Sequence, residues 1–334
     1  MKGKRVLVTG GAGFIGSHIV DKLIENNEVV VLDNLSSGKI SNIQHHLGRE
    51  GFTFIKGDIL DKDTVKEAVK GVDVVIHQAA VVGVKKYVKN PLNVLTTNIF
   101  GTHNLIEESL REGVERFVFA STSEIYGKNE KVPFKEDGDR VLGATNIARW
   151  CYSTSKAVDE HFLFAYYETY GFPMVILRYF NIYGPRQETS DYSGVIPIFI
   201  RRVLSGEPPL IHGDGKQTRA FTYITDAVEA TVLAVSNKSA VGEAFNIGSK
   251  EEVTIEQLAY MIIELAGNNS IKPKYIPYEE FYGKSYEDVR RRVPDVEKAE
   301  KVLGFRAKIP LREGLKKTIE WYKRSLLSGS DMIQ

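Results

Sequence analysis

The segment Arg5-Val-Leu-Val-Thr-Gly-Gly-Ala-Gly-Phe-Ile-Gly16 begins as an apolar strand and runs straight into a glycine-rich turn, and the residues that follow, Ser17 to Ile24, have helical spacing. Glycine at positions 10, 13 and 16 permits a tight turn and lets the helix pack closely on the strand. A helix that starts at such a turn offers free N–H groups and the positive end of its dipole. The segment therefore predicts a strand–turn–helix unit that can bind a pyrophosphate.

Further short apolar runs alternate with helical patterns through the first half of the chain. The predicted strands are 28–33, 52–56, 73–77, 116–120 and 174–179, and the predicted helices are 14–26, 61–69, 91–112 and 152–170. Continuous apolar runs separated by helices are typical of buried parallel strands. We expect an α/β fold in which residues 1–180 form a Rossmann-type doubly wound parallel sheet.

After Asn181 the pattern breaks into shorter elements, because prolines and glycines become frequent. We expect residues 181–330 to form a smaller C-terminal α/β lobe that binds the substrate and is interleaved with the first domain. Its predicted helices are 195–204, 224–235, 255–266 and 311–326.

The overall composition excludes several classes of protein. The 334 residues carry a net charge of +1 without any basic block, so neither nucleic acid nor a membrane surface is expected as a partner. No apolar run approaches the roughly 20 residues of a membrane-spanning helix. Cys151 is the only cysteine, so neither a disulfide nor a thiolate cluster can form within one chain, and the histidines have no metal-binding spacing. We expect a cytoplasmic protein with no metal site.

Asp33 ends the second predicted strand, at the distance after the glycine turn where dinucleotide-binding folds place an acid. A carboxylate there can accept hydrogen bonds from the adenosine ribose hydroxyls and would repel a 2′-phosphate. The next residue, Asn34, is not basic. The sequence therefore predicts NAD rather than NADP as cofactor.

The glycine spacing Gly-x-x-Gly-x-x-Gly resembles that of the extended short-chain dehydrogenase/reductases. Shorter matches are Gly57-Asp58-Ile59, His77-Gln-Ala-Ala80 and Asn98 in Thr97-Asn98-Ile99, although each also has an ordinary structural explanation, such as Asn98 bridging backbone groups. The resemblance spans nearly the whole chain. It implies cofactor contacts from Gly10, Gly13, Phe14, Ile15, Gly16, Asp33, Asn34, Asp58, Ile59, Ala79, Ala80, Asn98, Tyr152 and Lys156.

Tyr152-Ser-Thr-Ser-Lys156 places a phenol and an ammonium on one face of a predicted helix. A nearby positive charge favours phenolate, so we expect Lys156 to lower the pKa of Tyr152 and let it take a proton from a sugar hydroxyl as hydride leaves the carbon. In the resembled family these residues are base and helper. Thr122 corresponds there to the hydroxyl that hydrogen-bonds the reacting oxygen.

The next two residues, Ser123 and Glu124, bear on the choice of reaction. Simple hexose 4-epimerases usually carry small or hydroxyl residues here, and glucose-type 4,6-dehydratases commonly read Asp-Glu. Ser-Glu resembles the nucleotide-glucuronate decarboxylases, but mannose-type and some amino-sugar dehydratases share it. Beside a 4-keto sugar, Glu124 can handle the C5 proton or steer a C5 carboxylate. Alternatively, Glu124 only orders the loop.

Three later segments resemble the substrate site of nucleotide-sugar enzymes. They contribute Asn181 and Arg186 from 178–186, Arg219 from 216–223, and Arg292 from the basic segment 286–295. Arginine suits this task because its fork binds phosphate or carboxylate through two hydrogen bonds. The last segment, together with Arg149-Trp150, resembles decarboxylases of the aminoarabinose and apiose/xylose pathways, in which the residue matching Arg292 is implicated in decarboxylation.

We therefore expect an NAD-dependent enzyme that acts on a UDP-linked sugar through a 4-keto intermediate. The leading specific hypothesis is a UDP-glucuronate decarboxylase. The alternatives are a UDP-hexose or hexuronate 4-epimerase, a nucleotide-sugar 4,6-dehydratase and, from another class, a non-catalytic NAD-binding regulator. The resemblance also implies a homodimer that pairs the helices around residues 100–111 and 158–170 into a four-helix bundle.

Overall fold

A computed structural model describes residues 1–188, 194–277 and 289–327. Its centre is a seven-stranded parallel sheet with the order β11-β6-β5-β4-β1-β2-β3. This is the strand order of a dinucleotide-binding fold extended by one strand, so the expected Rossmann-type sheet is confirmed. The strands are β1 (Arg5–Thr9), β2 (Glu28–Asp33), β3 (Phe52–Lys56), β4 (Val74–His77), β5 (Arg116–Thr122), β6 (Met174–Tyr179) and β11 (Glu243–Ile247).

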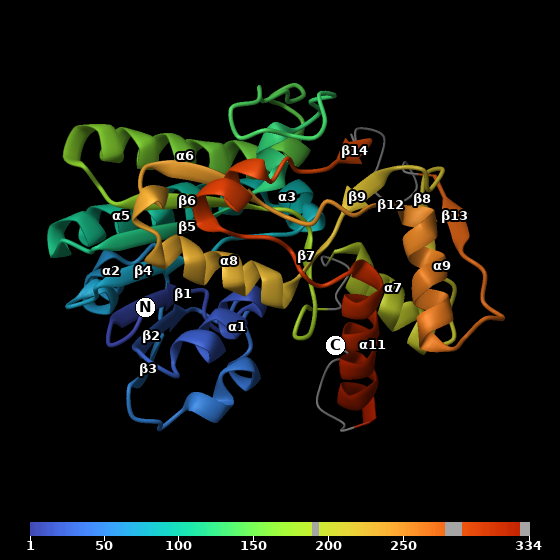
Figure 1. Ribbon diagram of the computed structural model, residues 1–334, viewed down its shortest axis with the longest axis horizontal. Coiled ribbons are helices and arrows are strands. Elements are labelled where there is room, and N and C mark those ends of the chain that lie inside the picture. Colours follow the sequence, from blue (N-terminus) through green and yellow to red (C-terminus); the bar gives the residue numbers. More distant parts are fainter. Residues whose placement is uncertain (189–193, 278–288, 328–334) are drawn as a thin grey trace.

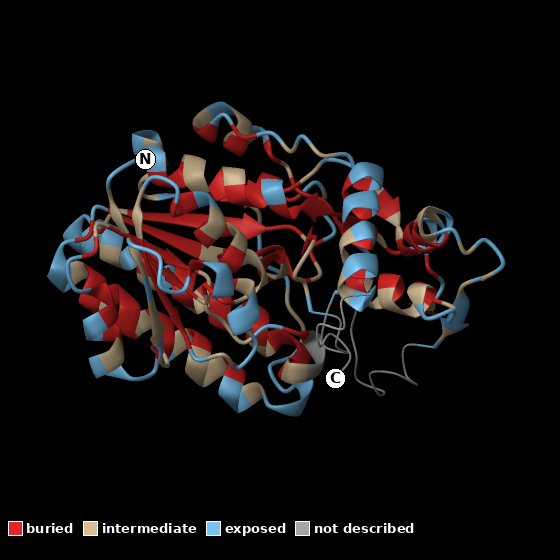
Figure 2. Ribbon diagram, turned by 90° about the horizontal axis from the view of Figure 1, so that it is seen from below, coloured by how far each residue is buried: buried red, intermediate tan, exposed pale blue. Residues whose placement is uncertain are grey.

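Helices cover both faces of this sheet (Figure 1). One face carries α1 (Phe14–Leu23) and α8 (Ile224–Ser236), and the other carries α2 (Lys62–Val69), α5 (Gly101–Glu112) and α6 (Cys151–Tyr170). Side chains alternate along each strand, so in β1 Val6 and Val8 pack into the core of the first face while Leu7 packs into the second. Figure 2 shows the strands as the most continuously buried part of the molecule.

The predicted helix 91–112 has an interruption within it. The chain forms α4 (Pro91–Leu95), then a π-helical segment (Thr96–Phe100), and then α5. A short helix, α3 (Val84–Lys89), precedes them and was not predicted. Its six residues are too few for a helical period to stand out from the loop around it.

The smaller lobe lies beyond the carboxyl ends of the strands, at the right of Figure 1. It contains α7 (Val195–Leu204), α9 (Ile255–Ala266) and α11 (Leu311–Leu327), close to their predicted bounds. Three small sheets complete it. Two have two strands each, β8 (Leu210–His212) with β13 (Lys274–Ile276) and β7 (Ile182–Tyr183) with β10 (Thr222–Tyr223), and one has three, with β9 (Thr218–Ala220) between β12 (Glu252–Thr254) and β14 (Arg291–Arg292). Between these elements the chain returns to the main sheet, where β11 pairs with β6.

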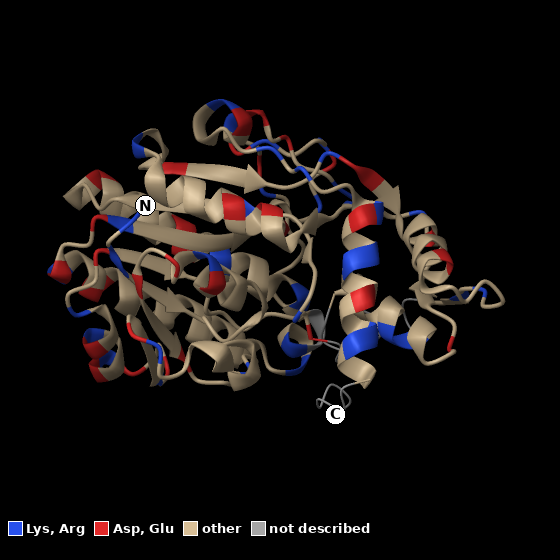
Figure 3. Cartoon of the chain, turned by 60° about the horizontal axis from the view of Figure 1, so that its bottom comes forward, with Lys and Arg blue, Asp and Glu red and all other residues tan. Residues whose placement is uncertain are grey.

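Charged side chains of both signs are interspersed over the molecule, for example along α11 (Figure 3). Within the described ranges, no helix combines the length and the apolar character needed to cross a bilayer.

Candidate functional site

A cleft of about 940 Å³ runs along the carboxyl ends of β1, β2, β3 and β4. Ligands of open parallel sheets bind at this edge, near the point where the strand order reverses. The cleft brings together most of the residues predicted to contact the cofactor: Gly10, Gly13, Phe14, Ile15, Gly16, Asp33, Asn34, Asp58, Ile59, Ala79 and Ala80.

The glycine turn is shaped so that side chains are excluded from it. Gly10 has a φ of +66°, and a Cβ on it would lie 2.8 Å from the backbone nitrogen of Ala79. A Cβ on Gly16 would lie 2.1 Å from the carbonyl oxygen of Gly10. The glycines therefore let the start of α1 pack tightly against the glycine turn and the segment after β4, and Gly10, Gly13 and Gly16 line the cleft, where a helix N-terminus favours phosphate.

Asp33 is held in a fixed orientation at the end of β2. Its Oδ2 accepts a hydrogen bond from the backbone N–H of Ala12 at 3.0 Å, and its Oδ1 accepts one from Leu35 at 2.8 Å. Burial raises the pKa of this carboxyl, and the two N–H donors oppose that shift. Each oxygen keeps a lone pair for a further donor, as the hydroxyls of a ribose would supply.

Asn98 does not line the cleft. It is fully buried, its Oδ1 accepts from the backbone N–H of Val81 at 2.8 Å, and its amide donates to Ser155 Oγ at 3.1 Å. Asn98 thus ties the cleft wall at Val81 to α6. A direct contact with the cofactor stays a prediction.

A second cleft of about 680 Å³ continues from the first, sharing Phe14, Ile15, Gln78 and Ala80 with it. It lies between the sheet and the smaller lobe. Among the predicted catalytic and substrate residues, the structure brings Thr122, Ser123, Glu124, Tyr152, Asn181, Arg219 and Arg292 together there.

Tyr152 is buried in the first turn of α6. Its ring stacks on that of Tyr87, with centroids 4.6 Å apart and an interplanar angle of 4°, and its hydroxyl is hydrogen-bonded to the Thr122 side chain. Burial and then the charge of Glu124 raise the pKa of Tyr152, and only the hydrogen bond with Thr122 acts in the opposite direction. The described side chains alone therefore do not produce the expected lowering of this pKa.

The reason lies in where Lys156 points. Its Nζ lies 3.8 Å from the Asp159 carboxylate and 3.8 Å from the centroid of the Phe119 ring. Burial lowers the pKa of Lys156, and Asp159 counteracts that effect; burial raises the pKa of Asp159, and Lys156 counteracts it. The charge on Lys156 is thus supported by a neighbour three residues along the same helix.

Glu124 is clamped by two arginines. Arg149 Nη1 donates to Oε2 at 2.5 Å and Nη2 donates to Oε1 at 3.2 Å, and Arg292 Nη1 reaches Oε1 at 3.4 Å. Burial alone would raise the pKa of Glu124, but the charges of Arg149 and then Arg292 outweigh burial and lower it to about 2. Glu124 is therefore ionised at neutral pH and cannot serve there as a proton donor.

The remaining predicted residues take different positions. Ser123 is buried in the 3₁₀ turn Ser123–Tyr126 that follows β5. The amide of Asn181 donates to the carbonyl of Ala220 at 2.8 Å, and Arg219 donates to the carbonyl of Thr218 at 2.8 Å. Arg186 instead lines the first cleft, where it is paired with Asp21 at 2.8 Å. Of the basic segment 286–295, residues 286–288 lie outside the described residues.

Sequence reasoning missed three contributors: Arg149 as a partner of Glu124, Tyr87 as the stacking partner of Tyr152, and Asp159 beside Lys156. Arg149 lies two residues before the start of α6 and three before Tyr152, and this nearness in the sequence is the signal that could have indicated a place in the site. Tyr87 lies in the unpredicted helix α3, and only the fold brings it to Tyr152.

Comparison with known proteins agrees with this geometry. The family model described as "NAD dependent epimerase/dehydratase family" matches residues 6–248. A UDP-N-acetyl-alpha-D-glucosaminuronate decarboxylase of Bacillus cytotoxicus is 43% identical over 321 residues, which cover 96% of this chain and 98% of the relative.

Two solved structures have closely similar folds. The UDP-N-acetylglucosamine 4-epimerase of Methanobrevibacter ruminantium, solved with UDP-N-acetylmuramic acid, has a TM-score of 0.88 at 35% identity and matches over 97% of this chain and 100% of its own. A UDP-glucuronic acid 4-epimerase of Bacillus cereus, solved with UDP-4-deoxy-4-fluoro-glucuronic acid and NAD, has a TM-score of 0.86 at 32% identity, over 96% and 99%.

The matched family model covers more than half of the chain, and the relatives span nearly all of it. The glycine turn and Asp33, which line the first cleft, fit the NAD on which that family depends. The chain is therefore a member of the NAD-dependent epimerase/dehydratase family, whose enzymes act on nucleotide-linked sugars.

Proposed function

We propose that this enzyme decarboxylates a UDP-linked hexuronate, with UDP-glucuronate as the leading candidate. The observation that carries the proposal is the clamp of Arg149 and Arg292 on Glu124, in the cleft that also holds Tyr152. The cleft presents the guanidinium of Arg292 together with Tyr152, whereas Arg149 does not line the cleft and is bonded to Glu124 through both Nη atoms. Guanidinium is a group that binds and orients a carboxylate well.

The first step uses Tyr152 and Thr122. Bound NAD supplies a hydride acceptor and the positive charge of its oxidised ring, a charge that favours phenolate at Tyr152. Thr122 orients the C4 hydroxyl of the sugar, and Tyr152 takes its proton while the C4 hydrogen leaves as hydride. Lys156, which Asp159 keeps charged, lies beside Asp159 in this structure and would support the phenolate only by turning its Nζ toward the bound cofactor and Tyr152. The product is a 4-keto hexuronate, which is a β-keto acid.

The second step breaks the bond between C5 and the carboxyl carbon. The electron pair of that bond passes to C5 and the C4 carbonyl, and the resulting enolate is stabilised by hydrogen bonds from Tyr152 and Thr122. Water supplies the proton that replaces the carboxyl group at C5. Tyr152 then returns its proton to the C4 oxygen, while the first cleft would hold the reduced cofactor that gives the hydride back to C4. Arg292 orients the leaving carboxylate, and Glu124 holds Arg149 and Arg292 in place.

Ser123 disfavours a glucose-type dehydratase, because it stands where those enzymes commonly carry the Asp that protonates the departing hydroxyl group. The 4-epimerase is the second candidate, because epimerases are among the similar solved structures. It shares the first step and differs by returning hydride to the opposite face of the sugar.

The test is incubation with NAD and a panel of UDP-glucuronate, UDP-N-acetylglucosaminuronate, UDP-glucose, UDP-N-acetylglucosamine and dTDP-glucose, followed by mass spectrometry. Loss of carbon dioxide from a uronate is expected. Unchanged mass with a changed chromatographic position would establish epimerisation instead, and loss of water would establish dehydration. Either result without loss of carbon dioxide contradicts the decarboxylase.

A homodimer is part of the same proposal. Phe100, which directly precedes α5, and Tyr170 at the end of α6 are 61% and 63% exposed. Large apolar side chains on two adjacent helices favour burial against a second copy.

A further inference from the structure

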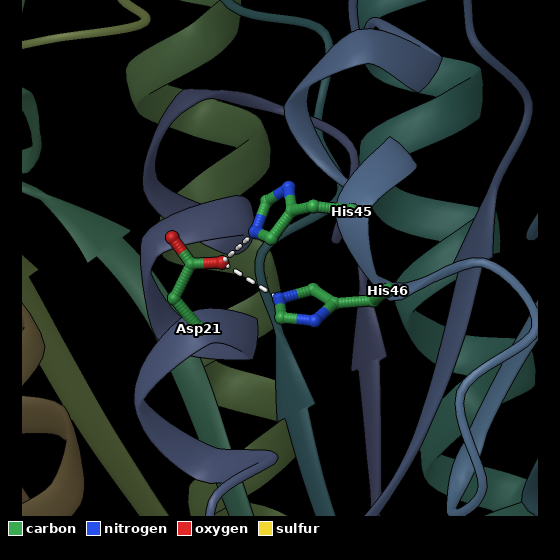
Figure 4. A group of neighbouring side chains, drawn as sticks. All are labelled: Asp21, His45 and His46. Carbon is green, nitrogen blue, oxygen red and sulfur yellow. Dashed lines mark hydrogen bonds and ion pairs between the residues drawn. The ribbon is translucent and has the colours of Figure 1, made fainter.

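Asp21, His45 and His46 form a compact cluster outside both clefts (Figure 4). Asp21 lies in the last turn of α1, and the two histidines belong to the 3₁₀ turn Gln44–His46. Nε2 of His45 and Nε2 of His46 each lie 2.8 Å from the same oxygen, Oδ1 of Asp21. All three candidate ligand atoms lie within 4.8 Å of one another.

This spacing is close to what a tetrahedral metal site needs. Metal–ligand bonds of about 2.0–2.1 Å place the ligand atoms of a tetrahedral Zn²⁺ site about 3.3 Å apart. The two nitrogens would therefore have to move about half an ångström away from Oδ1, and because the half-exposed His45 is the less constrained of the two, most of the adjustment falls to its side chain. Two imidazoles and one carboxylate form a ligand set that zinc sites commonly use.

The surroundings fix two of the three ligands and leave the third accessible. His46 is 5% exposed and packs against the ring of Phe52, whereas the side chain of His45 is half exposed. Arg186 binds the other oxygen of Asp21, Oδ2, at 2.8 Å and so orients Oδ1 toward the histidines. An ion can thus enter beside His45 and keep a water molecule as its fourth ligand.

We propose that Asp21, His45 and His46 bind one divalent transition-metal ion with the preferences of Zn²⁺. The ion would tie α1 to the 3₁₀ segments at 40–46. The same two elements flank the dinucleotide cleft, because Phe14 and Ile15 of α1 and Ser41 and Asn42 line it. The site therefore acts as a clip on the wall of the cleft and takes no part in the reaction itself.

The affinity should be moderate for a physical reason. When Nε2 of His46 binds the metal, the ring proton moves to Nδ1, which is buried and has no hydrogen-bond partner in the described structure. An unpaired buried donor destabilises the metal-bound form, and the positive charge of Arg186 further weakens cation binding. A dissociation constant on the order of micromolar fits these costs, well short of a structural zinc finger.

The test uses the full-length enzyme without a histidine tag, treated with chelator and then dialysed against Zn²⁺. We expect one bound Zn²⁺ per chain by elemental analysis, at least about tenfold weaker binding in His45→Ala and Asp21→Asn, and a Co²⁺-substituted protein with the visible absorption of a tetrahedral site. His161→Ala is the matched control, because His161 is an exposed histidine of α6 on the other face of the sheet.

Thermal unfolding gives a second readout that does not depend on enzyme activity. Zn²⁺ should raise the midpoint of unfolding in the parent and in His161→Ala but not in His45→Ala, since binding to the folded state stabilises it. His45 is exposed, so its replacement should leave the fold intact. Absence of saturable Zn²⁺ binding to the parent, or equal binding by the parent and His45→Ala, would mean that the cluster is only a hydrogen-bonded triad.

Discussion

Arg149 forms a bidentate ion pair with Glu124, in which Nη1 donates to Oε2 at 2.5 Å and Nη2 donates to Oε1 at 3.2 Å. Both side chains are largely buried, at 3% and 14% exposure. Removing one partner of such a pair leaves a buried charge that Arg292 alone must compensate. The ion pair of Arg149 and Glu124 therefore stabilises the folded protein and also shapes the site.

Arg149→Met should destabilise the protein by about 3 kcal/mol, measured by urea unfolding at pH 7. Because the pKa of Glu124 lies below its ordinary value of 4.5, the contribution is complete above pH 4.5 and is lost as the pH falls through about 2. The control is Arg312→Ala, which breaks the exposed pair with Glu264 and should change little. Equal effects of the two substitutions would contradict the role assigned to Arg149.

Tyr152→Phe should abolish reduction of NAD and all product formation together, because it removes the group that takes the C4 proton. Glu124→Gln and Arg292→Ala should leave the sugar oxidisable but slow the loss of carbon dioxide, so that bound NADH and a 4-keto sugar accumulate. The measurement is NADH absorbance during a single turnover, with mass spectrometry of the sugar. An active Tyr152→Phe enzyme would overturn the redox assignment. Turnover without NADH accumulation in both other variants would favour the epimerase.

Asp159→Asn should move the alkaline limb of the kcat–pH profile down by about one pH unit. Asp159 raises the pKa of Lys156 against the lowering by burial, so its neutralisation makes Lys156 lose its proton at lower pH. The readout is kcat as a function of pH at saturating substrate. A purely structural role would instead reduce kcat by the same factor at every pH.

NAD should bind at least about tenfold more tightly than NADP, because a 2′-phosphate would meet the buried Asp33 carboxylate in place of ribose hydroxyls. Dissociation constants from fluorescence titration of both reduced cofactors measure the ratio. Asp33→Asn should narrow the ratio mainly by weakening NAD. Comparable affinities of the parent for the two cofactors would refute the ribose assignment.

Phe100→Glu should convert a dimer into a monomer, measured by light scattering at micromolar concentration. A charge buried in an apolar contact between helices loses its hydration without gaining a partner. Leu47→Glu is the control, since Leu47 is 46% exposed near the 3₁₀ turn at 44–46 and outside the helices proposed to pair. A parent enzyme that is already monomeric would disprove the dimer.

Much of the Rossmann sheet could be predicted from the sequence because five of its first six strands, β1, β2, β4, β5 and β6, are short, largely buried runs, and the edge strand β3 (Phe52–Lys56) has the β-rich run Phe-Thr-Phe-Ile. The parts of the site that could be predicted from the sequence are those formed by neighbouring residues: the glycine turn, and the four-residue spacing of Tyr152 and Lys156. Two kinds of feature could not be predicted. The seventh strand, β11, comes after part of the smaller lobe and its run Glu-Ala-Phe-Asn-Ile is only partly apolar.

The other kind is electrostatic and depends on contacts distant in the sequence. Arg292 reaches Glu124 across 168 positions of the chain. The expected effect of Lys156 on Tyr152 failed for a related reason, since spacing along a helix places two residues on one face but does not say which neighbour the flexible lysine chain will approach. Asp159, one turn further along α6, is that neighbour.

The pairing of β11 with β6 bears on how this enzyme could be divided or recombined. A fragment that stops near residue 180 would leave the outer edge of β6 with unpaired backbone groups, and such an exposed strand edge promotes aggregation. A chimaera that takes the smaller lobe of a relative should therefore have two junctions, so that residues 243–247 stay with the parent sheet. A single junction after β6 would replace β11 and so separate β6 from the strand with which it pairs.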